Sequence, residues 1–348
     1  MKKKSRTSSK ILFFILLSVT ISLSTGAEDY FYRVQSGAGE PAHISGNTID
    51  SVKAEANSLN FYSESLPAHT QALSGARVTF TTGNLNVMTF NVRGKSGEDG
   101  QSLKWNERQL KIKQMLLDEG VDIVGTQETE LDQQTWLEEN LTGYATAKGV
   151  RNNNDATPKG EYNSIFYRTD RFTLLSPGGT FWLSDTPEEL SKVPESSATR
   201  IATWVKLEDK ITGEQIFAIN THIDHTNATA QDKQVRILMQ QIQLRHDGAK
   251  VVLTGDFNMR PENANIVYIS DPSHAFHLLH ARDIAVRRTG LTYSYHGCGA
   301  TPLQERYLAD YVFVGDGTEV SQYSVMPEKL DDVYLSDHAP VFAKITFK

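Results

Sequence analysis

The chain has 348 residues, 39% of them hydrophobic and 22% charged, so it is long enough for one large domain or two ordinary ones. Its 42 acidic residues outnumber its 35 basic ones, and the net charge of −7 argues against the basic surface of a tight nucleic-acid binder. A nuclease is not excluded, because bound divalent cations reverse the local field. Cys298 is the single cysteine, so there is no intrachain disulfide, and we interpret it as a small side chain in a tight loop.

The first 27 residues have the pattern of a secretory signal peptide. Five basic residues within positions 2–10 precede an apolar run from Ile11 to about Ser24, and small residues follow up to Ala27. The run is shorter than the ~20 residues of a membrane-spanning helix, so we expect cleavage near Ala27 and a secreted or periplasmic protein without a stable membrane span. Without this segment, 30 basic residues stand against 42 acidic ones, a net charge of −12.

Two regions that differ in composition and apolar patterning follow. Residues 28–84 are rich in serine, glycine, alanine and threonine and show few sustained apolar patterns, so we expect a loosely structured or accessory segment there. From Leu85 onward, patterns typical of strands and helices alternate. Residues 85–91 alternate like a strand, and residues 106–120 carry apolar side chains on about one helical face before Gly120.

Further elements are expected along the rest of the chain. Short apolar runs predict strands at residues 122–125, 164–167, 202–205, 215–219, 250–253, 311–313 and 341–345. Helices are expected at residues 131–140 and 232–246. Because the strands are separated sometimes by helices and sometimes by turns, the pattern indicates mixed sheets with helices outside.

Polar side chains lie at one end of five of these strands. The segments are Thr-Phe-Asn-Val-Arg at 89–93, Thr-Gln-Glu-Thr at 126–129, Asn-Thr-His-Ile-Asp-His at 220–225, Gly-Asp-Phe-Asn at 255–258 and Ser-Asp-His at 336–338. Each alone has an ordinary explanation as a turn, a helix N-terminal acid or a surface histidine. Together they supply the carboxylates, amides and histidines that hard-metal ligation and proton transfer at a phosphate require.

In this order, the five segments resemble the endonuclease/exonuclease/phosphatase (DNase I-like) superfamily. The resemblance covers about residues 85–348, which are therefore expected to form the catalytic domain. Residues 180–187, Thr-Phe-Trp-Leu-Ser-Asp-Thr-Pro, resemble a marker of one branch with poorly defined substrates. The resemblance implies a four-layer α/β sandwich, in which two mixed β-sheets pack face to face with outer helices and the site lies at the sheet ends.

The resemblance also implies a metal side and a water-activating pair. Asn91 and Glu128 match the metal side, with Glu128 as the direct Mg²⁺ ligand, and Asp337 matches an acid close to the metal. Few protein ligands suffice, because Mg²⁺ prefers one or two carboxylates together with waters and phosphate oxygens. Asp256 and Asn258 match the pair that orients the attacking water and holds the phosphate.

Two histidine–carboxylate pairs complete the implied site. His338 matches the phosphate-side histidine that Asp310 orients, and His222 matches a second histidine with Glu161 as its carboxylate partner. Such pairing favours the imidazolium, the form that can donate to phosphate. Three further residues are expected to contact substrate: Asn163, Arg200 and Asn220.

These matches predict a monomeric, Mg²⁺-dependent hydrolase, with Mn²⁺ as an alternative ion, that cuts phosphodiester bonds by in-line attack of water. Nucleic acid is slightly favoured as substrate, because both histidine–carboxylate pairs are those of DNase-like members. The alternatives are an inositol phosphate phosphatase and a sphingomyelinase-like phosphodiesterase acting on a phospholipid headgroup. More remote alternatives are a zinc-dependent metallo-β-lactamase-like hydrolase, whose first histidine would fall at Asn220, and a non-catalytic binding module.

Overall fold

The computed structural model describes residues 84–95, 104–151 and 160–348, and within residues 1–83 the backbone of six strands. These strands form two three-stranded antiparallel sheets. One has the order β1 (Ser18–Ile21), β2 (Tyr30–Gln35), β6 (Arg77–Thr82), and the other has the order β3 (Ser51–Glu55), β4 (Ser58–Ser63), β5 (Leu66–Ala72). Five of these strands lie within residues 28–84, where we expected a loosely structured or accessory segment. Most of the expected signal peptide lies outside the described residues.

The chain divides into two compact units, Met1–Asn84 and Leu85–Lys348, and two large mixed sheets form the second. The first sheet has the order β16 (Ala285–Gly290), β18 (Thr318–Val325), β21 (Val341–Phe347), β7 (Leu85–Asn91), β8 (Ile123–Thr129), β10 (Tyr162–Arg168), β9 (Tyr144–Ala147). The second has the order β11 (Phe172–Trp182), β12 (Ile201–Asp209), β13 (Gln215–His222), β14 (Lys250–Asp256), β17 (Asp310–Val314), β15 (Leu279–His280).

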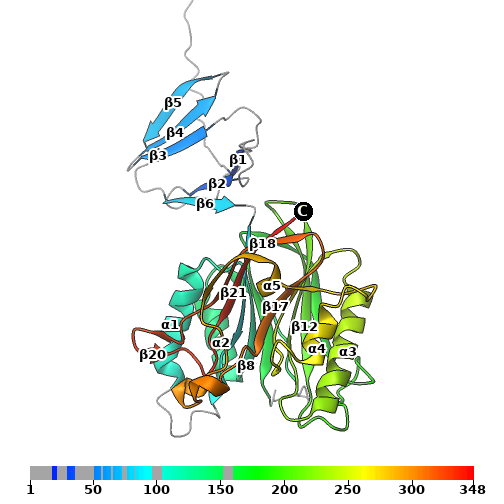
Figure 1. Ribbon diagram of the computed structural model, residues 1–348. Coiled ribbons are helices and arrows are strands. Elements are labelled where there is room, and N and C mark those ends of the chain that lie inside the picture. The colour runs from blue at the N-terminus through cyan, green and yellow to red at the C-terminus, as the bar shows by residue number, and fades with distance from the viewer. Residues whose placement is uncertain are drawn as a thin grey trace, which may run out of the picture. The chain divides into compact units, whose positions relative to one another are not determined.

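Helices cover the outer faces of the two sheets (Figure 1). Helices α1 (Trp105–Asp118) and α2 (Leu131–Asn140) share a buried apolar cluster with β7, β8 and β10 of the first sheet. Helices α3 (Ala228–Arg245) and α4 (Ala264–Ile269) pack with the second sheet, in a larger cluster that also contains residues of the first. The predicted four-layer α/β sandwich is therefore confirmed.

Short elements complete the unit: α5 (Ala281–Ile284), the 3₁₀ turns η2 (Gly297–Gly299) and η3 (Leu303–Glu305), and the two-stranded pair β19 (Lys329–Leu330) and β20 (Val333–Tyr334). In the described part of the chain, no helix is long and apolar enough to cross a membrane.

Because of the strand directions, strand ends that carry polar side chains lie together at one rim. Strands β7 and β8 run parallel to each other, as do β13 and β14, so the carboxyl ends of each pair lie side by side. Strand β17 runs antiparallel to β14, which sets its first residue, Asp310, opposite Asp256. Strand β21 runs antiparallel to β7, so the loop with His338 reaches the same rim as Asn91. This topology brings segments far apart in the chain to one edge of the sandwich.

Behind this rim, Asn220 joins the two sheets. Its side-chain nitrogen donates to the carbonyls of Thr126 (2.8 Å) and Ser164 (3.1 Å), and its oxygen accepts from Gln127 Nε2 (2.7 Å) and Thr254 Oγ1 (3.1 Å). The side chain is fully buried, and both of its polar atoms are engaged. The structure therefore gives Asn220 a bridging role between the sheets, in place of the expected contact with substrate.

A second polar bridge lies at the opposite rim. Arg171, buried between β10 and β11, donates from Nη1 to Asp122 (2.6 Å) and from Nη2 to Asp209 (2.9 Å). Asp122 immediately precedes β8 in the first sheet, and Asp209 ends β12 in the second. All three side chains are at most 3% exposed, so this ion network is buried. It lies at the other ends of the strands from the polar rim.

Candidate active site

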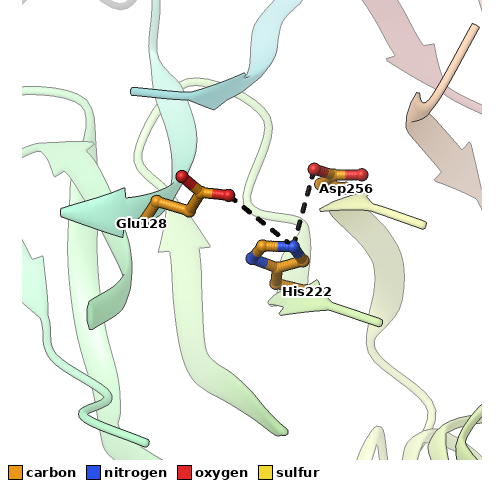
Figure 2. A group of neighbouring side chains, drawn as sticks. All are labelled: Glu128, His222 and Asp256. Atoms are coloured by element: carbon orange, nitrogen blue, oxygen red, sulfur yellow. Dashed lines mark ion pairs between the residues drawn. The ribbon is translucent and has the colours of Figure 1, made fainter. Parts of the chain in front are cut away.

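Three side chains from different strands converge at the rim (Figure 2). His222 Nε2, at the end of β13, lies 3.6 Å from Asp256 Oδ2 and 4.0 Å from Glu128 Oε1. Asn91, at the end of β7, donates from Nδ2 to Glu128 Oε1 (3.0 Å) and to Asp256 Oδ2 (2.9 Å). One amide thus holds two carboxylates from the two sheets next to each other.

The backbone at this rim is held in the left-handed region at three non-glycine residues, one of which is Arg93 with φ of 60°. Glu128 has φ of 62° and Asn258 has φ of 53°. Such conformations cost on the order of 1 kcal/mol each and persist where the surrounding structure requires them. At Asn258 the result is useful, because its N–H donates to Asp256 Oδ1 (2.9 Å) and its Nδ2 lies 3.0 Å from His222 Nε2.

His338 is oriented by Asp310, as expected. His338 Nδ1 donates to Asp310 Oδ2 at 2.8 Å, which turns Nε2 toward Asp256 Oδ2 at 3.7 Å. Burial alone would lower the pKa of His338, but the carboxylates of Asp310 and Asp256 outweigh burial and hold it well above its usual value. The imidazolium form, with an N–H directed into the site, is therefore favoured.

The pKa of Asp256 is raised as well, which for a carboxyl group favours the neutral form. Burial, with a further contribution from the negative charge of Asp310, raises the pKa of Asp256 to about 7. The nearby His338 and the hydrogen bond from Asn91 limit this rise. A carboxylate with a pKa close to neutrality can accept a proton from water at physiological pH and release it afterwards.

The expected pairing of His222 with Glu161 is not found. Glu161 binds Arg151 through two contacts, Oε2 to Nη1 at 2.9 Å and Oε1 to Nη2 at 3.0 Å. The backbone explains this, because the N–H of Arg151 donates to the carbonyl of Glu161 (3.2 Å) and so places the guanidinium fork beside the carboxylate. His222 Nδ1 is buried and has no hydrogen-bond partner among the described residues.

His222 is therefore not the imidazolium that we expected. Burial and the positive charges of Arg200 and Arg151 lower the pKa of His222 well below its usual value, so its ring is neutral. A neutral ring can accept a hydrogen bond at Nε2 or bind a cation there, but it cannot donate a charge-assisted bond to phosphate. Only one of the two expected histidine–carboxylate pairs is present.

The remaining predicted residues lie around this centre. Asp337 pairs with Arg93 (2.6 Å), whose N–H donates to Asn91 Oδ1 (3.0 Å), so Asp337 reaches the metal side only through that arginine. Asn163 is buried on β10, and in the amide orientation that satisfies both of its polar atoms its nitrogen donates to the carbonyl of Tyr162 (3.1 Å) and its oxygen accepts from the backbone N–H of His222 (3.3 Å).

Arg200 is a buried cation behind His222. Its Nη2 lies 3.2 Å from His225 Nδ1, and its Nε has no hydrogen-bond partner among the described residues. Arg151, which pairs with Glu161, was not among the residues assigned to the site. The sequence signal for Arg151 is a basic side chain shortly before β10. The sequence does not distinguish such a residue from one on a solvated loop.

The donor set fits a hard divalent cation. The carboxylates of Glu128 and Asp256 and the nitrogen of His222 each offer one ligand atom, all within 4.8 Å of one another. Among the described residues, these two carboxylates form ion pairs only with histidines, and no lysine or arginine pairs directly with either. Carboxylate oxygens close together and without a basic partner are typical of a Mg²⁺ or Mn²⁺ site.

Comparison with known proteins agrees with the geometry. An endonuclease/exonuclease/phosphatase from Bacteroides vulgatus is 30% identical, with a TM-score of 0.70 over 76% of this chain and 99% of its own. A mannosyl-6-phosphatase from Bacteroides thetaiotaomicron is 29% identical, with a TM-score of 0.68 over 76% of this chain and 100% of its own. The catalytic domain of human Nocturnin, at 20% identity and a TM-score of 0.60 over 76% of this chain and 95% of its own, shares the fold.

None of the curated proteins that were compared matches the chain. The model of the Endonuclease/Exonuclease/phosphatase family matches residues 88–338, from β7 to the loop that carries His338. This match spans every segment on which the resemblance depended, and the resemblance is confirmed. The chain belongs to the Endonuclease/Exonuclease/phosphatase family.

Proposed function

We propose that this protein is a metal-dependent phosphoesterase in which Asp256 activates the attacking water. The family supports a hydrolase acting on phosphoesters. The observation that carries the proposal is the juxtaposition of two perturbed groups, because the near-neutral carboxyl of Asp256 lies 3.7 Å from the imidazolium of His338. A proton acceptor and a positively charged donor side by side are what attack of water on an anionic ester requires.

Each residue then has a defined task. Glu128, with His222 and Asp256, would hold a divalent cation. This cation would supply positive charge for the phosphate oxygens. Asp256 takes a proton from water while Asn91 and the N–H of Asn258 keep its two oxygens in place. His338 donates from Nε2 to a phosphate oxygen, and Asp310 fixes the ring in that orientation. The water oxygen bonds to phosphorus as the bond from phosphorus to the ester oxygen breaks, and the leaving oxygen takes a proton from solvent while Asp256 releases its own, so water and ester give alcohol and phosphate.

We further propose that the substrate is a small phosphate monoester. The preference for nucleic acid depended on two histidine–carboxylate pairs, and His222 has no carboxylate partner of that kind. The negative net charge of the chain disfavours polyanions, whereas the buried cation Arg200, whose charge acts on His222, suits the dianion of one monoester. A neighbour at 29% identity is named a mannosyl-6-phosphatase, which supports the same class. Action in the periplasm or outside the cell, after cleavage near Ala27, belongs to the proposal.

A substrate panel tests the proposal. Purified protein with Mg²⁺ is assayed on an aryl phosphate monoester, a bis-aryl diester, an inositol phosphate, sphingomyelin, plasmid DNA and RNA. We expect the monoester to be hydrolysed best, EDTA to abolish turnover and Mg²⁺ or Mn²⁺ to restore it. Asp256→Asn should lose most activity, whereas the exposed Asp247→Asn should lose none. Preferred cleavage of DNA would contradict the monoester assignment, and hydrolysis of no ester would contradict the class.

A further inference from the structure

A pocket opens beside the catalytic centre and shares one residue with it. Its volume is about 330 Å³, and it extends from Asn258 along the segment that leads into α4. The polar and aromatic residues that line it are Asn258, Gln231, Arg260, Glu262, Asn263 and Tyr307. The mechanism above uses the backbone N–H of Asn258 and none of these side chains. A pocket of this size accepts one small group, not an extended polymer.

A row of aromatic rings connects the pocket with His338. The ring centroid of Tyr295 lies 5.1 Å from that of His338 and 5.6 Å from that of Tyr307. Isolated backbone bridges pair Tyr295 with both residues, so this row is fixed to the rim. Burial and the carboxylates of Asp256 and Asp310 raise the pKa of Tyr307, which places its hydroxyl within the field of the catalytic acids. Asn258 lines the pocket and its Nδ2 lies 3.0 Å from His222 Nε2, so the pocket adjoins the catalytic cluster and can receive the group that leaves from the phosphorus.

The wall of the pocket is flat and amphipathic. The guanidinium carbon of Arg260 lies 4.7 Å from the ring centroid of Tyr307, and its Nη2 donates to the carbonyl of Glu305 (3.1 Å). These two contacts hold the arginine against the ring. Planar walls of this kind pack against apolar faces of small molecules while their edges stay polar.

The other lining groups offer hydrogen bonds of both kinds. Gln231 uses Nε2 for the carbonyls of Asp224 (2.8 Å) and Asn258 (3.5 Å), which leaves its oxygen as an acceptor. Asn263 uses its oxygen to cap α4 through the N–H of Asn265 (2.9 Å), which leaves its NH₂ as a donor. Glu262 is exposed and forms no ion pair with a described residue. Donors and acceptors in alternation suit hydroxyl groups, each of which donates and accepts.

We propose that this pocket binds the alcohol part of the phosphate ester and that this part is a neutral, polyhydroxylated ring, as in a sugar phosphate. The inference rests on the proposed function, because the pocket is a leaving-group site only if the ester is cut at the neighbouring cluster. The carboxylate of Glu262 would repel a second phosphate, which disfavours an oligonucleotide or a polyphosphate in this position.

The test compares a polyhydroxylated ester with an alkyl ester of the same number of carbon atoms. We measure kcat/KM for a hexose 6-phosphate and for n-hexyl phosphate with Mg²⁺, and we expect the sugar ester to be favoured by about tenfold or more, because polar groups of the pocket stay unpaired with the alkyl ester. Glu262→Gln and Tyr307→Ala should each bring this ratio toward one. Glu139→Gln, which changes an exposed acid on α2, is the matched control and should leave the ratio unchanged. Free hexose should inhibit competitively.

The outcomes separate this inference from the proposed function. Equal kcat/KM for the two esters, or a ratio that Glu262→Gln does not change, would overturn the pocket assignment and leave the phosphoesterase standing. Preference for a nucleoside 5′-monophosphate over the hexose phosphate would overturn it in favour of a base-binding pocket. If a simple aryl phosphate is not hydrolysed either, the proposed function itself is wrong.

Discussion

At the scale of single residues, the site depends on one buried negative charge. Asp310 accepts the Nδ1 hydrogen of His338 and stands opposite Asp256 in the sheet register. Its charge raises the pKa of both neighbours, although burial contributes more to the rise at Asp256. Asp310 therefore raises the pKa of both the acid and the base. For this reason we expect a fully buried residue to affect the rate.

Asp310→Asn should shift the whole pH profile of kcat/KM to lower pH. Activity requires Asp256 deprotonated and His338 protonated, so it rises with pH through the first pKa and falls with pH through the second. Without the negative charge of Asp310 both pKa values decrease, and both limbs move to the acid side. The measurement is the pH–rate profile of the two proteins on one monoester. A shift of either limb to higher pH would contradict the assigned roles.

The sequence predicts where the polar side chains of the site lie, but not which groups they contact. Strand patterns place Asn91, Glu128 and Asp256 at strand ends, and the structure brings these residues together. Patterns do not predict which partner satisfies a given side chain. Glu161 binds Arg151 because a local backbone hydrogen bond sets the two side chains next to each other, and no sequence spacing encodes that contact.

At the scale of elements, predictability follows burial. The central strands β7, β8, β13 and β14 are buried along nearly their whole length and read as apolar runs. The strands at the sheet edges, β9, β11, β15 and β16, were not predicted, and neither was the interior strand β18, where the polar residues Glu319, Ser321 and Gln322 interrupt the apolar pattern. Strand β16 has no buried residue and β11 has two, so polar residues there leave no periodic signal. Edge strands are recognised by their neighbours in the sheet, which a local pattern does not contain.

Gly125→Ala tests the contact between the two sheets. A Cβ at this position would lie 2.1 Å from Thr254 Oγ1 and 2.5 Å from Asn220 Oδ1, inside the polar bridge. We expect the free energy of unfolding to fall by about 3 kcal/mol, because the bridge must open or the sheets must separate.

Gly315→Ala is the matched control for this change. Its Cβ would meet no atom closer than 3.6 Å, so stability should change by less than about 0.5 kcal/mol. Urea denaturation of the three proteins measures both effects. Equal stability of the two alanine variants would mean that the sheets are not held as closely at Asn220 as described.

At the scale of the whole molecule, the two rims of the sandwich divide stability from chemistry. Asp122, Arg171 and Asp209 connect the sheets at one rim, and the catalytic cluster lies at the other. Arg171→Met should lower the free energy of unfolding by about 3–5 kcal/mol, because two buried carboxylates lose their partner. The kcat of the folded fraction should stay unchanged, since no catalytic residue touches this network.

Lys233→Met is the corresponding control, since the ion pair of Lys233 with Glu195 lies at the surface. It should change stability too little to measure. Thermal unfolding together with the activity per folded molecule distinguishes the two effects. A large loss of kcat in folded Arg171→Met protein would mean that the two rims are coupled through the sheets.

The division of the chain into two units leads to the last prediction. The solved neighbours are matched over 99–100% of their own length by 76% of this chain, so the fold exists elsewhere without a counterpart of the remainder. Leu85–Lys348 is a compact unit with two buried apolar clusters. We therefore expect a fragment that begins at residue 84 to fold by itself and to hydrolyse a small monoester with a kcat/KM within about twofold of that of the longer chain. Circular dichroism and steady-state kinetics on the fragment and on residues 28–348 provide the measurement. An unfolded fragment would show that residues 28–83 contribute to the stability of the catalytic unit, and a folded fragment with much lower kcat/KM would show that they contribute to its site.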